Sequence, residues 1–167
     1  MLEILERYRL IQKENERYLK ELVDSINCGI AVVDAEDRKL VDINLAGAAM
    51  LGYEAGEMTS KLDHAAIFPQ DTDIFPLVPN LRSLPPRERL AARANGSLMP
   101  VLKSMTVVER GEKRYLIESF IDISGLKRAE SDLQASEAKY RRFFEEDLTG
   151  NFISANDGRI LDCNPAF

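Results

Sequence analysis

The stretch Tyr115–Glu130, YLIESFIDISGLKRAE, constrains the fold more than any other part of the chain. Its first half is rich in β-branched and aromatic residues, which is typical of a strand. After Gly125 the apolar residues recur at helical spacing with charged residues between them. These apolar residues are Leu126, Ala129 and Leu133. We therefore predict a strand that leads directly into a helix, so that a change in the sheet can be transmitted to the helix.

The composition excludes several classes of protein. The chain has 167 residues, a net charge of −6 and two cysteines that are far apart. It has no basic stripe for nucleic acid, no polybasic membrane patch and no apolar run long enough to cross a bilayer. Two distant cysteines do not indicate a disulfide framework, so we predict a cytoplasmic protein.

Residues 2–26 contain neither Gly nor Pro and read as one helix. Its apolar residues alternate at steps of four and three, which is the spacing of a heptad seam. This predicted dimer seam consists of Ile4, Tyr8, Ile11, Asn15, Tyr18 and Leu22. Asn15 would favour one register of a parallel pair, because an offset pairing would bury its side chain without a partner. The alternative is an amphipathic helix that packs on its own domain.

The next segment, residues 29–44, reads GIAVVDAEDRKLVDIN. Two short apolar runs flank a turn-rich centre and predict a β-hairpin. Asn44 is placed as the N-cap of a short helix that Gly52 closes. Residues 54–61 are compatible with a further short helix. From Arg87 onward, the sequence predicts three strands joined by tight turns.

The order of these elements resembles the PAS family of sensor domains. The motif Asp122-Ile123-Ser124, followed by Lys127, is similar to the Asp-Ile-Thr exit motif of that family. The resemblance implies an α+β protein with the PAS fold, in which a five-stranded antiparallel sheet carries short helices on one face. Coiled-coil-like helices would flank the domain at both ends. In the family, the motif's Asp pairs with a basic residue and clamps the angle between strand and helix, which implies signal-coupling roles for Asp122, Ser124 and Lys127.

An internal repeat suggests a second domain. Residues 39–44, KLVDIN, are matched 120 residues later by residues 159–164, RILDCN. We predict an N-terminal dimerisation helix over residues 1–25, a PAS domain over residues 26–124 and a linker helix over residues 125–145. Residues 146–167 would then be the truncated start of a second PAS domain, so the chain would be part of a longer protein.

The resemblance implies a ligand cavity between the sheet and its short helices. The candidate cavity residues are Cys28, His64, Phe68 and Phe75. His64 stands earlier than the haem ligand of haem-binding relatives, and the Asn-Cys-Arg-Phe motif of flavin-binding light sensors is missing. A cysteine-rich subgroup of the family has thiolates suited to iron–sulfur or another soft metal, but here its Cys-His pair is Asp63-His64 and its two Cys-Pro pairs carry phenylalanines. Haem, flavin and iron–sulfur are therefore all disfavoured, no metal is predicted and the cofactor is unknown.

The predicted function is that of a sensory and dimerisation module in a bacterial signal-transduction protein. The linker helix carries a second seam at Leu126, Leu133 and Tyr140, so we predict a homodimer through both flanking helices. No catalytic constellation is found, so we predict that the segment is not itself an enzyme. A histidine kinase of a two-component system is the preferred effector in the same chain, and a diguanylate cyclase is the second choice. A ligand-free interaction module is the competing hypothesis.

Overall fold

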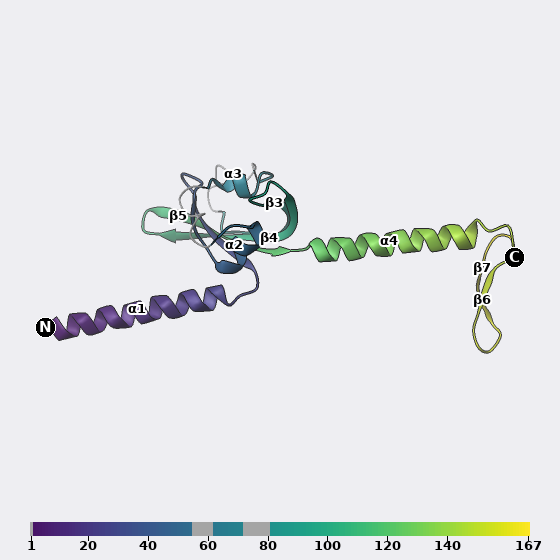
Figure 1. Ribbon diagram of the computed structural model, residues 1–167, viewed down its shortest axis with the longest axis horizontal. Coiled ribbons are helices and arrows are strands. Elements are labelled where there is room, and N and C mark those ends of the chain that lie inside the picture. The colour runs from purple at the N-terminus through teal and green to yellow at the C-terminus, as the bar shows by residue number, and fades with distance from the viewer. Residues whose placement is uncertain (1, 55–61, 72–80) are drawn as a thin grey trace. The chain divides into compact units, whose positions relative to one another are not determined.

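A computed structural model describes residues 2–54, 62–71 and 81–167 of the chain (Figure 1). The chain divides into two compact units, Met1–Ser124 and Gly125–Phe167. The first contains a five-stranded sheet and the second contains a long helix followed by a small hairpin. The positions predicted as a short helix at residues 54–61 lie outside the described residues, apart from Glu54, which is in no helix.

The sheet of the first unit is antiparallel throughout and has the strand order β2-β1-β5-β4-β3. Its strands are β1 (Gly29–Asp34), β2 (Leu40–Ile43), β3 (Ser83–Ala92), β4 (Leu98–Arg110) and β5 (Lys113–Asp122). Strand β3 begins four residues before the predicted start at Arg87. It is an edge strand, and Pro85 and Pro86 lie where its register with β4 shifts, so their missing N–H groups are tolerated. The predicted five-stranded antiparallel sheet and the α+β class are confirmed.

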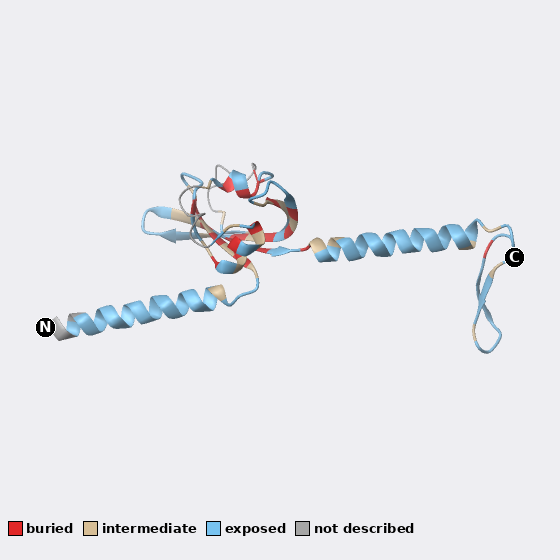
Figure 2. Cartoon of the chain, viewed as in Figure 1, coloured by how far each residue is buried: buried red, intermediate tan, exposed pale blue. Residues whose placement is uncertain are grey.

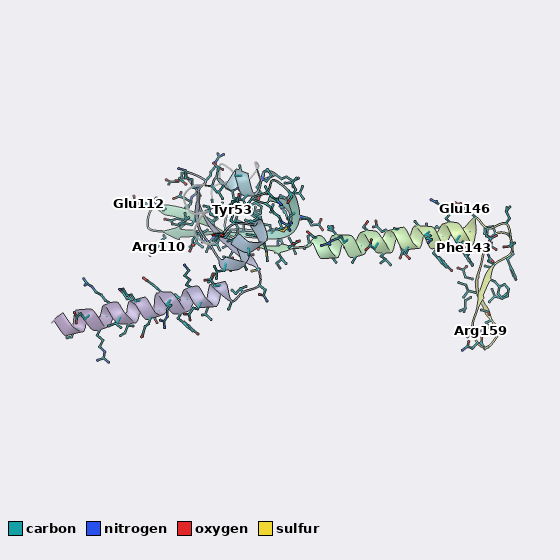
Figure 3. All side chains as sticks on the ribbon, in the orientation of Figure 1. Tyr53, Arg110, Glu112, Phe143, Glu146 and Arg159 are labelled. Atoms are coloured by element: carbon teal, nitrogen blue, oxygen red, sulfur yellow. The ribbon has the colours of Figure 1, made fainter. Side chains whose placement is uncertain are left out.

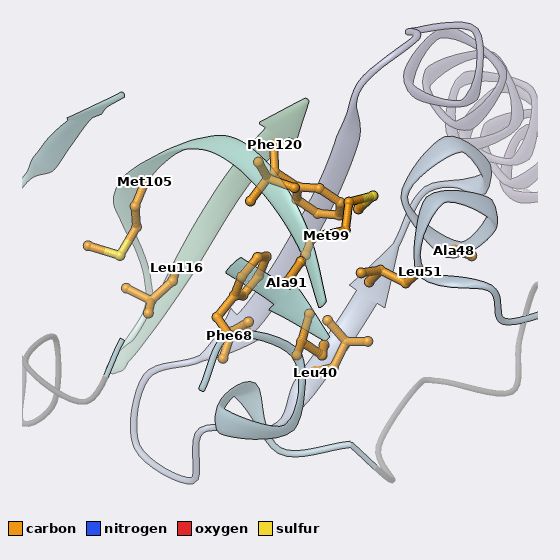
Figure 4. Close-up of a cluster of buried hydrophobic side chains, with 13 residues drawn as sticks. Leu40, Ala48, Leu51, Phe68, Ala91, Met99, Met105, Leu116 and Phe120 are labelled. Carbon is orange, nitrogen blue, oxygen red and sulfur yellow. The ribbon is translucent and has the colours of Figure 1, made fainter. Parts of the chain in front are cut away.

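Alternating residues of the strands form the buried face of the sheet, and two short helices contribute to the same core (Figure 4). These helices are α2 (Leu45–Leu51) and α3 (His64–Ile67). The ring of Phe120 lies so close to Gly29 that a Cβ at that position would be 2.2 Å from Phe120 Cζ. Gly29 is therefore required by the close approach of β1 to the aromatic core.

Asn44 connects three elements at the start of the domain. Its Oδ1 accepts hydrogen bonds from the backbone N–H of Ile30 and of Gly47, at 2.8 and 2.9 Å. Its Nδ2 donates to the carbonyls of Cys28 and Val23, at 2.9 and 3.1 Å. Asn44 thus caps α2, as predicted, and also fixes the first strand and the end of helix α1 (Leu2–Asp24).

Helix α4 (Ser124–Glu145) has no buried residue, and all of it except Ser124 belongs to the second unit (Figure 2). Its apolar side chains project into solvent, including Phe143, which is labelled in Figure 3. Helix α1 likewise exposes the apolar members of its predicted seam. None of the described helices combines the length and the apolar character that crossing a membrane requires.

The hairpin of the second unit, β6 (Phe152–Ser154) and β7 (Ile160–Cys163), repeats the geometry of the β1–β2 hairpin. In β1–β2, Ala31 pairs with Ile43, and in β6–β7 the pair is Phe152 with Cys163. Both hairpins shift register after the second pair. Both turns also contain a residue with positive φ at the equivalent position, Arg38 at 62° and Gly158 at 83°.

The hydrogen bonds that close the second hairpin follow the same pattern. Asn164 accepts from the N–H of Asn151 at 2.8 Å and donates to the carbonyl of Thr149 at 2.8 Å. Asn44 makes the equivalent two bonds with Ile30 and Cys28. The internal similarity of the sequence therefore corresponds to a repeated local structure.

Candidate functional site

A cluster of charged side chains lies inside the first unit, at positions where the strands otherwise carry apolar residues. On β4 the inward-facing residues are Met99, Val101, Lys103 and Met105, and on β5 they are Leu116, Glu118 and Phe120. Lys103 faces Phe120 across the two strands and Glu118 faces Met105, so the two charged side chains are diagonal neighbours on the buried face. Lys103 is 4% exposed and Glu118 is fully buried.

Two further members of the cluster come from the segment that contains α3. His64 is the first residue of α3, and its backbone N–H donates to the carbonyl of Arg38 at 2.8 Å. The N-cap of this short helix is Asp63, whose side chain accepts from the N–H of Ala65 at 2.9 Å. Asp71 follows the helix, and its N–H donates to the carbonyl of Phe68. Both His64 and Asp71 are buried against the sheet.

The ammonium group of Lys103 lies at the centre of the cluster. It donates to Asp71 Oδ2 in a short contact, lies 2.6 Å from Glu118 Oε1 and lies 3.1 Å from His64 Nε2. It is also 3.7 Å from the centroid of the Phe68 ring, a cation–π contact. His64 Nε2 is itself 2.9 Å from Glu118 Oε1. The Lys103 ammonium therefore contacts three side chains with lone pairs, one on β5 and two in the segment that contains α3.

Arg89 of β3 completes the charge balance of the cluster. Its Nε donates to Asp71 Oδ1 at 2.7 Å. Burial alone would raise the pKa of Asp71, but the charge and hydrogen bond of Lys103, the hydrogen bond of Arg89 and the charge of His64 outweigh it, so the pKa of Asp71 is lowered. Two carboxylates face the buried ammonium of Lys103 and the partly buried guanidinium of Arg89. This balance makes the burial of Lys103, Asp71 and Glu118 tolerable.

One atom of the cluster has no partner among the described residues. Glu118 Oε2 is buried and accepts no hydrogen bond. A buried carboxylate oxygen without a donor is costly, on the order of 1–3 kcal/mol. The site thus has spare capacity to bind a group that accepts electron pairs.

Of the predicted cavity residues, the structure brings His64 and Phe68 together. Their ring centroids are 5.5 Å apart, and Phe68 also packs edge-on against Phe120 at 5.5 Å. Figure 4 shows Phe68 within the buried cluster of the core. Cys28 is half-buried next to β1, and its carbonyl accepts from Asn44. Phe75 lies outside the described residues.

The predicted signal-coupling residues lie where β5 ends and α4 begins. Asp122 Oδ1 accepts from the N–H of Ser124 at 2.7 Å, so the Asp side chain holds the first residue of the helix. Asp122 Oδ2 lies 3.4 Å from Arg93 Nη2, an ion pair with the loop after β3. Lys127 Nζ lies 3.6 Å from Glu130 Oε2 one turn along α4.

Sequence reasoning missed Asp71, Arg89, Lys103 and Glu118, although two of them left a signal. Lys103 and Glu118 each interrupt a period-two run of apolar residues at an inward-facing position. Charged residues at such positions are rarely buried unless they are paired. Asp71 and Arg89 left no comparable signal, because their pairing depends on how the segment after α3 folds back on the sheet.

Comparisons with known proteins agree with this fold. Residues 17–89 match the model of a family described as PAS domain. Among solved structures, a PAS domain from a two-component sensor histidine kinase has a TM-score of 0.59 at 12% identity, covering 66% of this chain and 98% of that one. No curated protein shows a significant match.

Two further solved structures show the same fold. The PAS domain of an HTR-like protein from Haloarcula marismortui has a TM-score of 0.59 at 21% identity, covering 71% of this chain and 99% of that one. A domain of a sensory box sensor histidine kinase/response regulator from Geobacter sulfurreducens has a TM-score of 0.51 at 20% identity, covering 65% of this chain and 94% of that one. The first unit therefore has the PAS fold, and residues 17–89 match the PAS domain model.

Proposed function

We propose that this chain is the sensory and dimerisation part of a bacterial signal-transduction protein, and that a change inside the PAS domain is transmitted to helix α4. The preferred effector is a histidine kinase in the same polypeptide, acting in the cytoplasm, and a diguanylate cyclase is the second candidate. The segment senses and transmits, and catalysis belongs to the effector. The PAS domain of a two-component sensor histidine kinase among the similar structures supports this choice.

The main support for this proposal is that strand β5 connects the buried charged cluster to the start of helix α4. The same strand provides the buried Glu118 of the charged cluster, then Phe120 of the core, and then Asp122, two residues before α4 begins. A change in the contacts of Glu118 therefore acts on a strand whose last residue binds the first N–H of the helix. A small-molecule or redox signal in the cavity would be read in this way.

The junction is proposed to act as a clamp on the angle between strand and helix. Asp122 holds Ser124 through a hydrogen bond and is paired with Arg93, and Lys127 stands in the first turn of α4 as the family's basic residue does. These charges are partly exposed, so the pairs contribute only about 0–1 kcal/mol to stability. Their proposed role is to fix the angle between strand β5 and helix α4.

A second copy of the chain is the proposed partner of both flanking helices. The seam residues of α1 and α4 are exposed in the single chain, at heptad spacing, and a helix with such a stripe is stabilised by pairing with an equal stripe. Native mass spectrometry of the purified chain tests this proposal. A dimer is expected, and a monomer would contradict the seams at both ends.

Residues 146–167 are proposed to form the first hairpin of a second domain of the same fold. The β6–β7 hairpin repeats three features of β1–β2: the pairing register, the position of the register shift, and an asparagine whose side chain accepts a backbone hydrogen bond from the start of the hairpin. The apolar residues of this hairpin are exposed, including Phe152 and Leu161. Further strands would be required to cover them.

A ligand-free interaction module is the second candidate function. It is favoured by the observation that Phe68 is buried in the core and that Lys103 holds its ammonium among the polar groups of the interior. In this role the domain would hold its two flanking helices apart and position them for dimerisation, without binding a ligand. An absorbance spectrum and an intact mass of the native protein separate the two: a bound small molecule favours sensing, and a bare chain favours the module.

The test of the coupling proposal is Asp122→Ala in the full-length protein, with output activity as the readout. We expect the output to lose its response while the fold, measured by far-UV circular dichroism, is unchanged. Glu112→Ala is the matched control, because Glu112 is an exposed acid in the turn between β4 and β5. Normal signalling by the Asp122→Ala protein would contradict the proposed clamp at the junction of β5 and α4.

A further inference from the structure

We propose that His64, Asp71 and Glu118 form a binding site for a divalent transition metal, and that the ammonium of Lys103 is an internal cation that competes for the same position. This inference deepens the proposed sensory function and rests on it for its role in signalling. It names the class of ligand: a metal ion that accepts nitrogen and oxygen donors.

The three donors have the chemistry and the spacing that such an ion requires. They are one imidazole nitrogen and two carboxylate oxygens, all within 4.8 Å of one another. An ion about 2.1 Å from each donor places neighbouring donors about 3 Å apart and opposite donors about 4.2 Å apart. His64 Nε2 lies 2.9 Å from Glu118 Oε1 and 4.0 Å from Asp71 Oδ2. Both separations fit within this range.

The position of Lys103 shows that the three donors already converge on one cation. Its Nζ contacts Asp71 Oδ2, Glu118 Oε1 and His64 Nε2. The donors come from β5 and from the segment around α3, and Lys103 comes from β4. The fold therefore brings lone pairs from separate elements to the point where a positive charge is held.

An ammonium group does not satisfy this set of donors fully. His64 Nε2 carries either one lone pair or one proton, so it can satisfy Lys103 or Glu118 but not both. Glu118 Oε2 has no hydrogen-bond partner although its side chain is fully buried. A metal ion would accept the lone pair of Nε2 and could take both oxygens of Glu118, and this would remove both deficits.

Only a small space, with room for about one water-sized group, lies beside the cluster for a displaced ammonium. A cavity of about 20 Å³ is lined by Asp71, Lys103 and Ser104, where β3 shifts register against β4. The flexible four-carbon stem of Lys103 permits such a movement. Arg87 and Arg89 also line this cavity, so the displaced ammonium meets repulsion. Binding to the wild-type chain is therefore weak, and binding improves when the lysine charge is removed.

The test is a titration of the 167-residue chain with Co²⁺, followed by visible absorbance and by isothermal titration calorimetry. Cys28→Ser and Cys163→Ser form the background, so that thiolates cannot bind the ion. In this background, with the native lysine at position 103, we expect one Co²⁺ to bind per chain. Lys103→Met should tighten binding by on the order of 100-fold, because a competing charge at the centre of the site is removed. Lys139→Met, an exposed lysine of α4, is the matched control and should change nothing.

Two variants test the donors directly. His64→Gln and Glu118→Gln should each abolish the Co²⁺ absorbance, in the wild-type and in the Lys103→Met background. The proposal is overturned if a folded Lys103→Met chain binds Co²⁺ no more tightly than the chain with Lys103. It is also overturned if Co²⁺ binding persists in the Glu118→Gln variant. If Lys103→Met does not fold, the wild-type titration decides, and a wild-type chain that binds no Co²⁺ overturns the site. The coupling proposal is tested separately by the output of Asp122→Ala, so either can fail alone.

Discussion

The pair Lys103–Glu118 offers the sharpest prediction for stability, because both side chains are buried and charged. Lys103→Met removes one cation, which leaves Asp71 paired with Arg89 and leaves Glu118 beside His64 alone. Glu118→Gln removes one carboxylate and leaves two cations facing only Asp71. Breaking a buried pair on one side costs about 3–5 kcal/mol, because an uncompensated charge remains in the interior. Each single variant should lose a large part of a typical stability of about 5–15 kcal/mol.

The double variant Lys103→Met/Glu118→Gln restores the balance of charge, with Asp71 still paired to Arg89 at 2.7 Å. We therefore expect it to be less destabilised than the sum of the two single variants, by about 2 kcal/mol or more. The assay is urea unfolding at neutral pH followed by far-UV circular dichroism, on all four members of the cycle.

A cycle on a pair whose lysine is exposed to solvent gives the control. Lys113 Nζ lies 3.4 Å from Asp34 Oδ2, and the lysine side chain is 60% exposed, so Lys113→Met with Asp34→Asn should show little coupling. If the unfolding free-energy changes of the Lys103 and Glu118 variants add to within about 0.5 kcal/mol, the two side chains are not energetically coupled, and this would contradict the buried network.

Three further predictions concern stability. Gly29→Ala should destabilise the domain by about 1–3 kcal/mol, because the new Cβ would clash with Phe120, whereas Gly125→Ala has open space and should leave the midpoint of thermal unfolding unchanged or slightly raised. Asn44→Ala should lower the midpoint of urea unfolding by the equivalent of about 1–2 kcal/mol through loss of the α2 cap, and an unchanged midpoint would contradict its connecting role. Because the folded-state pKa of Asp71 lies below its ordinary value of 3.8, its carboxylate stabilises the fold above that pH, and this contribution is lost as the pH falls through the lower folded value. Acid titrations of Asp71→Asn should therefore show a shallower loss of stability than those of wild type, and an equally steep loss would speak against the Asp71 pairs.

The sheet was predictable from sequence because its signals are local. Alternating apolar residues, the asparagine before α2 and the turn residues each report on a few neighbouring positions. The start of β3 was placed too late, because Pro85 and Pro86 argue against a strand, and only the sheet topology shows that they lie at a register shift on an edge.

The charged cluster was predictable only in part. His64 was a candidate because it is the one histidine in the chain, and the lysine and glutamate stand at inward-facing strand positions. Which charges meet depends on strand pairing and on the path of the segment around α3, and these are contacts between residues far apart in sequence. The pairing of Lys103 with Asp71, for example, spans 32 positions.

The most direct test of the central claim, that the interior of the PAS domain acts on α4 through β5, is an epistasis measurement in the full-length protein. Output activity is measured for Glu118→Gln, Asp122→Ala and the double variant, each confirmed as folded by circular dichroism. We expect Glu118→Gln to change the output when Asp122 is present and to have no further effect in the Asp122→Ala background. An equal effect of Glu118→Gln in both backgrounds would show that the signal does not pass through the Asp122 junction.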